Sequence, residues 1–121
     1  MTKNVPPRPL DDATLSDFLA EHTFGVLATL KRDGRPHLST VVYTWDPDTR
    51  EIRISTTEDR LKVKQIRTNP HVSLHVSSAD NWSFAVAEGK AELSAVARTP
   101  ERRLDITLRA ERLYGTALDI A

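Results

Sequence analysis

The stretch Gly25–Trp45, with the sequence GVLATLKRDGRPHLSTVVYTW, decides the fold. Its two halves, Gly25–Lys31 and His37–Trp45, are rich in the β-branched and apolar residues that favour strands. The Asp33-Gly34 pair between them favours a tight hairpin turn. The stretch therefore predicts two antiparallel strands joined by a short loop.

Four further strands are expected along the chain. Glu51–Thr56 follows a turn rich in Asp and Pro, and is expected to complete a three-stranded meander with the first hairpin. Apolar and polar residues alternate in His71–Ser77 and in Leu104–Leu108. Trp82–Leu93 is expected to be a long strand with Trp82, Phe84 and Val86 on one side, in which Gly89 allows a bend or bulge. Together these segments predict a mainly β fold, a six-stranded antiparallel barrel decorated with short helices.

The ends of the chain carry different signals. Residues 1–9 contain three prolines, which deny this segment helix and ladder hydrogen bonds, so a loose arm is expected. Asp11 or Asp12 is expected to cap a short helix, and residues 10–121 to form a single domain. The tail Tyr114–Ala121 is expected either to dock on the domain or to fray.

Composition narrows the function classes. The 17 Lys and Arg residues balance 17 Asp and Glu residues, so no overall charge attracts nucleic acid or a membrane surface. The absence of cysteine excludes disulfides, thiolate metal sites and a cysteine nucleophile. No apolar run approaches the ~20 residues that a membrane span requires, and the N-terminus lacks an apolar signal segment. A soluble, cytoplasmic protein is expected, with neither nucleic acid nor membrane as a partner.

The segment Ser55–Arg67, with the sequence STTEDRLKVKQIR, is the strongest candidate for a binding site. Three hydroxyls end a strand, and a helix over about Asp59–Thr68 begins at once with two cations near its first turn. The residues concerned are Ser55, Thr56, Thr57, Arg60 and Lys62, with Thr56 or Thr57 as the expected helix cap. A helix N-terminus favours an anion, and Arg and Lys add charge-assisted hydrogen bonds. A phosphate monoester or diester would fit, and the alternative is an ordinary capped helix with a solvated basic face.

Other polar residues do not form a recognisable site. His71 and His75 share a strand face but lie ~13 Å apart, too far to bind one metal ion. The serines lack the context of a nucleophile elbow. Trp82 and Phe84 share a strand face, which indicates barrel core or a dimer interface more than stacking on a ring. We therefore predict no metal site and no catalytic side chain.

Four motifs in this order resemble the pyridoxamine-phosphate-oxidase-like split β-barrel family, whose members bind FMN or F420. They are the hairpin Gly25–His37, the pair Arg60-Leu61-Lys62 and Asn69-Pro70, the strand Trp82–Gly89, and the final strand Arg103–Gly115. Within that family the chain is most similar to the actinobacterial branch that uses coenzyme F420.

The resemblance implies a six-stranded split barrel that works as a homodimer, with F420 or alternatively FMN bound across the interface. It implies that Arg60 and Lys62 hold the cofactor phosphate, that the ring lies along the strand His37–Val41, and that the partner's Trp82 flanks it. The cofactor-binding residues so implied are His37, Ser39, Thr40, Val41, Ser55, Thr56, Thr57, Arg60, Lys62, Gln65 and Trp82. In this family hydride leaves the reduced cofactor directly, and catalysis is positioning and exclusion of water.

The chain departs from the family pattern in one place. Only Ser94–Arg102 connects the last two strands, where related sequences usually carry a helical insertion. A shortened connection is consistent with an open pocket, a large substrate, or a protein that binds a cofactor without efficient catalysis. The leading prediction is a hydride-transferring reductase of a small conjugated or electron-poor substrate, and the alternative is a non-catalytic cofactor carrier.

Overall fold

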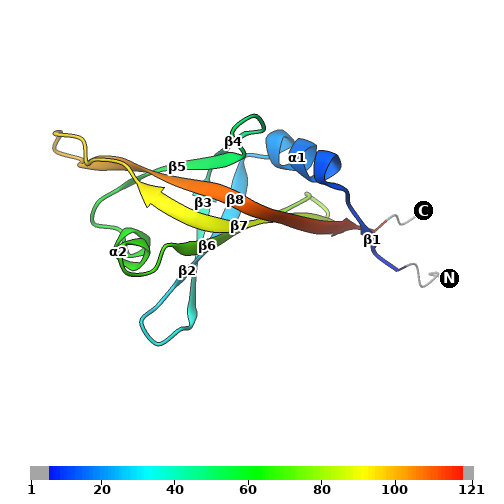
Figure 1. Ribbon diagram of the computed structural model, residues 1–121, viewed down its shortest axis with the longest axis horizontal. Coiled ribbons are helices and arrows are strands. Elements are labelled where there is room, and N and C mark those ends of the chain that lie inside the picture. The colour runs from blue at the N-terminus through cyan, green and yellow to red at the C-terminus, as the bar shows by residue number, and fades with distance from the viewer. Residues whose placement is uncertain (1–5, 119–121) are drawn as a thin grey trace.

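The computed structural model describes residues 6–118, which form one curled antiparallel sheet flanked by two helices (Figure 1). The strands are β1 (Arg8–Pro9), β2 (Phe24–Leu30), β3 (Pro36–Val42), β4 (Thr44–Asp46), β5 (Glu51–Thr57), β6 (His71–Ser77), β7 (Ser83–Leu93) and β8 (Arg103–Ala117). The helices are α1 (Asp12–Glu21) and α2 (Leu61–Thr68). The predicted mainly β split barrel is confirmed.

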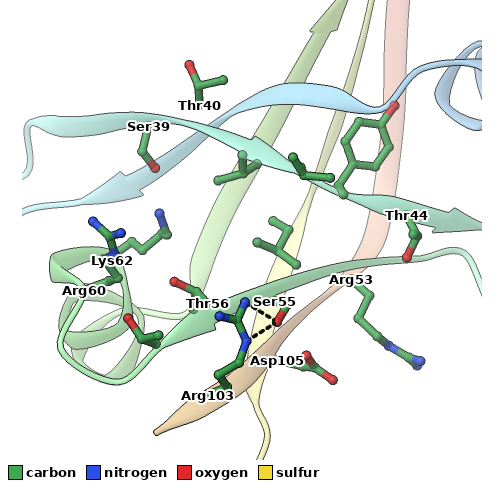
Figure 2. Close-up of a pocket in the computed structure, with 15 residues that line it drawn as sticks. Ser39, Thr40, Thr44, Arg53, Ser55, Thr56, Arg60, Lys62, Arg103 and Asp105 are labelled. Carbon is green, nitrogen blue, oxygen red and sulfur yellow. Dashed lines mark hydrogen bonds between the residues drawn. The ribbon is translucent and has the colours of Figure 1, made fainter. Parts of the chain in front are cut away.

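The strand order in the sheet is β3-β2-β6-β7-β8-β5-β4, with β1 paired to β8. β5 pairs with β8 over its whole length, from Glu51 opposite Arg109 to Thr57 opposite Arg103. The expected three-stranded meander is confirmed only near its second turn, where β4 pairs with β5, because β3 and β5 do not pair. The sheet curls until these two strands face each other across an open seam (Figure 2).

The seam opens because the return strand of the first hairpin divides at Tyr43. Only the part beyond it pairs with β5, with Thr44 opposite Arg53. The Tyr43 side chain is buried, and its hydroxyl donates to the Leu19 carbonyl oxygen of α1 at 2.6 Å. Burial raises the pKa of Tyr43 well above its usual range. On either side of this anchor the return strand changes its partner, from β2 up to Val42 to β5 from Thr44 onward.

Two strands lie beyond the six that the sequence predicts. One is β4, the divided end of the return strand. The other is β1, where Arg8 pairs with Ala117 and Pro9 with Thr116, so the expectation of an arm without ladder pairing is wrong at these two residues. β8 runs on to Ala117, which shows that the tail docks that far, and residues 119–121 lie outside the described part of the chain.

Both helices pack on the sheet through short apolar faces. α1 has Asp11 as its N-cap, as predicted, and the Asp11 carboxylate accepts from the Thr14 backbone N–H at 2.8 Å. α2 begins at Leu61, with Arg60 at the N-cap position and no side-chain cap. The prediction of Thr56 or Thr57 as cap is wrong, because both residues belong to β5. The two helices are ten and eight residues long, and within residues 6–118 none is long and apolar enough to cross a membrane.

The core lies inside the curl of the sheet. Alternate residues of each strand are buried there, and α1 and α2 cover its two ends, as the ribbon shows (Figure 1). The fully buried aliphatic side chains include Leu19, Leu27, Ile52, Val63, Leu74, Val76, Ile106 and Leu108. As expected, Gly89 accompanies a β-bulge, where a Cβ atom would lie 1.8 Å from the Arg109 carbonyl oxygen. No side chain fits that approach.

Candidate functional site

A groove of about 780 Å³ lies along the open seam between β3 and β5 (Figure 2). β3 forms one wall, β5 and the start of β8 form the other, and the beginning of α2 closes one end. The structure brings most of the predicted cofactor-binding residues together in it. They are Ser39, Thr40, Val41, Ser55, Thr56, Thr57, Arg60 and Lys62.

The β3 wall presents a hydroxyl without a partner. The Ser39 side chain points into the groove and the Thr40 side chain points away from it (Figure 2), while Val41 is buried in the core. Ser39 Oγ is buried and makes no hydrogen bond within residues 6–118. An unpaired buried polar group costs about 1–3 kcal/mol, so this hydroxyl is suited to a ligand that hydrogen-bonds to it.

The α2 end presents two cations, of which Arg60 lies beside the Asp59 carboxylate. The hydrogen bond from Thr57, and then the charge of Arg60, lowers the pKa of Asp59. Arg60 is the N-cap residue, and Lys62 lies in the first turn. Neither forms an ion pair with any of the described residues. Burial, and then the neighbouring charge of Arg60, lowers the pKa of Lys62. A helix N-terminus that carries two cations and has no side-chain cap favours a bound anion.

The opposite wall supplies cations that sequence reasoning missed. Arg103 of β8 donates from Nε and Nη2 to Ser55 Oγ, at 3.3 and 3.0 Å. Arg53 and Asp105 line the same groove. With Arg60 and Lys62, four cations and one carboxylate line it, which leaves a formal charge of +3 (four minus one). The sequence could have indicated Arg53 as a groove residue, because it lies two residues before Ser55 and therefore on the same face of β5. Arg103 could not be identified from the sequence, because its position beside Ser55 depends on the pairing of β5 with β8.

Two predicted residues lie beside the groove and bind each other. Gln65 Oε1 accepts from the Thr29 hydroxyl at 2.6 Å and lies 2.9 Å from His37 Nδ1. Neither His37 nor Gln65 lines the groove. The structure thus places both residues in a hydrogen-bond cluster that links α2 to the first hairpin.

Trp82 lies far from the groove of its own chain. It precedes β7 in the turn after β6, it is 51% exposed, and its carbonyl oxygen accepts from the Leu118 backbone N–H. The neighbouring Ser83 pairs with Ala117, twelve residues along β8 from Asp105, which corresponds to about 40 Å of strand. Its predicted contact with a cofactor therefore requires a second copy of the chain.

The short connection before β8 supports the turn that precedes α2. The Glu58 backbone N–H donates to the Arg102 carbonyl oxygen at 3.0 Å, and the two side chains form an ion pair. The Arg102 hydrogen bond lowers the pKa of Glu58. The connection is therefore short but in contact with the anion-binding end of the groove.

The described side chains do not converge on a metal site. Within residues 6–118, no group of three His, Cys, Asp or Glu residues is placed to hold a metal ion. The arrangement can bind an anion at one end and a polar ligand edge along β3.

Comparison with known proteins gives matches over nearly the whole chain. A family model described as pyridoxamine 5'-phosphate oxidase matches residues 12–120. The F420H(2)-dependent biliverdin reductase of Mycobacterium tuberculosis (strain CDC 1551 / Oshkosh) is 31% identical over 129 residues, which covers 94% of this chain and 93% of that protein.

Two solved structures show the same fold. A conserved hypothetical protein from Mycobacterium tuberculosis has a TM-score of 0.75 at 22% identity, and the match covers 96% of this chain and 90% of that one. A FAD-binding protein from Mesorhizobium loti has a TM-score of 0.76 at 17% identity, with 94% and 98% covered.

Proposed function

The chain belongs to the pyridoxamine 5'-phosphate oxidase family, and from that membership we propose that it is an F420H2-dependent oxidoreductase, with FMN as the alternative cofactor. The cofactor lies in the groove between β3 and β5, with its phosphate at the beginning of α2 and its ring along His37–Val41. The substrate is a small conjugated or electron-poor organic molecule, and the protein works in the cytoplasm.

The observation that carries this proposal is the distribution of unpaired polar groups in one groove. Within residues 6–118, Arg60 and Lys62 form no ion pair at one end of the groove, and Ser39 Oγ is buried without a hydrogen bond on the β3 wall. A phosphate bound to the cations places an attached ring system along β3, where Ser39 meets its polar edge. The residues present therefore fit a phosphorylated flavin or deazaflavin.

The chemistry needs little from the side chains. When bound in its reduced form, such a cofactor supplies a hydride. The residues of this chain bind the phosphate, orient the ring and exclude water from one face. We assign no catalytic side chain, and the rate gain comes from holding the two reactants at a short, fixed separation.

The relative from Mycobacterium tuberculosis favours F420 over FMN, because its name specifies F420H(2) as the reductant. The positive charge of the groove also favours F420 over FMN. Four cations against one carboxylate exceed what a single phosphate monoester needs, whereas F420 carries carboxylates beyond its phosphodiester. The biliverdin named for that relative is a conjugated molecule, which is consistent with the substrate class proposed here.

We propose a homodimer, formed through the outer face of the first hairpin. Phe24 and Val42 are paired across β2 and β3, and they are 63% and 55% exposed. Leu38, 61% exposed, lies on the same face of β3. Such a row of exposed apolar side chains is typical of a protein–protein contact. A second copy docked near the groove would also bring the partner's Trp82 within reach of the cofactor.

The alternative is a carrier that binds the cofactor without turnover. The connection 94–102 favours it, because this segment contacts the Glu58 turn and supplies no helix to cover the groove. Binding would then be tight, and the bound reduced cofactor would not react with acceptors.

A titration separates these functions. Purified protein is titrated with F420 and with FMN while the ring fluorescence is followed, and the reduced complex is then mixed with enone, quinone and bilin acceptors. Turnover of any acceptor supports the oxidoreductase. Binding without turnover supports the carrier, and binding of neither cofactor refutes both.

A further inference from the structure

The cluster beside the groove joins three elements that the groove depends on. Thr29 of β2 is 1% exposed, and its hydroxyl donates to Gln65 Oε1 of α2. His37 Nδ1 of β3 lies 2.9 Å from the same oxygen. Because a carboxamide oxygen only accepts, Nδ1 carries the proton and His37 is also a donor. One oxygen atom thus ties a helix to both strands of the hairpin.

The residues of this link lie on the same two elements as the proposed binding residues of the groove. On α2, Gln65 lies three residues after Lys62, so the two side chains are about one helical turn apart. On β3, His37 lies two residues before Ser39 and therefore faces the same side of the sheet. The link therefore connects the helix that begins at the anion-binding turn with the strand proposed to hold the ring.

The turn before α2 is held by the Glu58–Arg102 contacts, and the helix itself has few directional contacts with the sheet. An isolated helix of eight residues is not stable in water, and α2 has no side-chain N-cap. Its buried contacts are Val63 and Ile66, which are apolar and do not fix its position along the strand direction. The hydrogen bonds at Gln65 are directional, and they join α2 to both strands of the hairpin.

We propose that Gln65 is a positioning residue, which acts through Thr29 and His37 to hold the phosphate-binding turn at the correct distance from β3. This inference rests on the proposed cofactor site. Gln65 itself does not touch the ligand. Its role is to make the phosphate and the ring of one molecule bind at the same time.

Thr29 offers a test that is free of direct ligand contact, since it is buried and does not line the groove. The affinities of FMN and riboflavin, and of F420 and its phosphate-free deazaflavin, are compared in Gln65→Leu, Thr29→Val and Thr29→Ser. Thr68→Val is the matched control, because its hydroxyl donates to the Lys64 carbonyl at the other end of α2. Circular dichroism and thermal melting confirm that each variant is folded.

For Gln65→Leu, the Kd of the phosphorylated ligand is expected to rise roughly tenfold, the loss from a misaligned charge-assisted hydrogen bond. The phosphate-free ligand should change less than about twofold, since it does not use the turn. Thr29→Val should lower the phosphate preference in the same direction, and Thr29→Ser and Thr68→Val should retain it. The 15N spectrum of the His37 ring should show the Nδ1–H tautomer in the wild type and lose it in Gln65→Leu.

Two outcomes overturn the inference, and they are distinct. If the wild type binds the cofactor but the phosphate preference survives in Gln65→Leu and Thr29→Val, Gln65 has no positioning role. If the wild type binds neither cofactor, the proposed function fails and the inference falls with it.

Discussion

The Arg103 guanidinium donates two hydrogen bonds to the Ser55 hydroxyl, across a strand pair whose members are 48 residues apart in the chain. This contact orients a cation from the last strand along the wall of the groove. Both groups lie on the outer face of the β5–β8 pair, where water competes with the contact. The contact therefore contributes little to stability, and its main effect is to orient the Arg103 guanidinium toward a ligand in the groove.

Arg103→Gln should weaken F420 binding roughly tenfold, because one charge-assisted hydrogen bond to an anionic group is lost. The matched control is Arg109→Gln on the same strand, since Arg109 pairs with Glu51 and does not line the groove. Fluorescence titration measures both Kd values. Equal effects of the two substitutions would show that only general charge matters.

Arg60→Ala and Lys62→Ala should each weaken the binding of a phosphorylated cofactor by about 1.5–3 kcal/mol, the range for hydrogen bonds to charged groups. The binding of riboflavin should hardly change. Lys64→Ala is the control from the same helix, because Lys64 does not line the groove between β3 and β5. Unchanged affinity in both site variants would place the phosphate elsewhere.

Cofactor binding should weaken as the pH rises toward 10.5, the ordinary pKa of lysine. Burial and the charge of Arg60 lower the pKa of Lys62, so its positive charge is lost at a lower pH than that of an exposed lysine. The charged form binds phosphate, hence affinity is high below that pKa and falls above it. The test is the Kd at a series of pH values in the wild type and in Lys62→Met, which should lack this fall.

Ser39→Ala should separate stability from binding. The hydroxyl makes no hydrogen bond among the described residues, so its removal should leave the free protein unchanged or raise its stability by up to about 1 kcal/mol. Cofactor affinity should fall, because the ligand loses a partner. Thermal melting and titration measure the two quantities. A loss of stability without a loss of affinity would mean that Ser39 has a structural role.

Val42→Arg should convert the proposed dimer to a monomer, because it places a charge among the exposed apolar side chains of Phe24 and Leu38. Sedimentation velocity measures the mass. Lys64→Ala, on a helix away from that face, is expected to remain dimeric. A wild type that sediments as a monomer at all concentrations would contradict the proposed dimer.

Much of the fold can be read from the sequence, because alternation and turn residues are local signals. The segment His71–Ser77 and the Asp33-Gly34 turn predict their structure correctly. The pairing of β5 with β8 cannot be read in this way, because it is decided by packing between distant segments. The same reason explains the division at Tyr43, which depends on a contact with α1.

The residues of the candidate site also fall into two groups, those that local sequence indicates and those that depend on contacts between distant segments. Arg60 and Lys62 are recognised from sequence because they begin a helix, a feature of a few residues. The cap is misassigned because the Thr57 hydroxyl donates to the Asp59 carboxylate at 2.6 Å and leaves the helix end uncovered. Arg103 is missed because only the sheet register brings it to Ser55.

The open seam described above also affects how this scaffold can change during evolution. Among residues 6–118, β3 pairs with β2 on one side only, so no described strand uses the main-chain amides and carbonyls of its other edge. A planar ligand held by such groups is recognised without reference to side-chain identity. If the proposed cofactor lies along this edge, substitutions on this wall can change specificity while the main-chain groups stay in place, and a lineage can diversify its chemistry without rebuilding the scaffold.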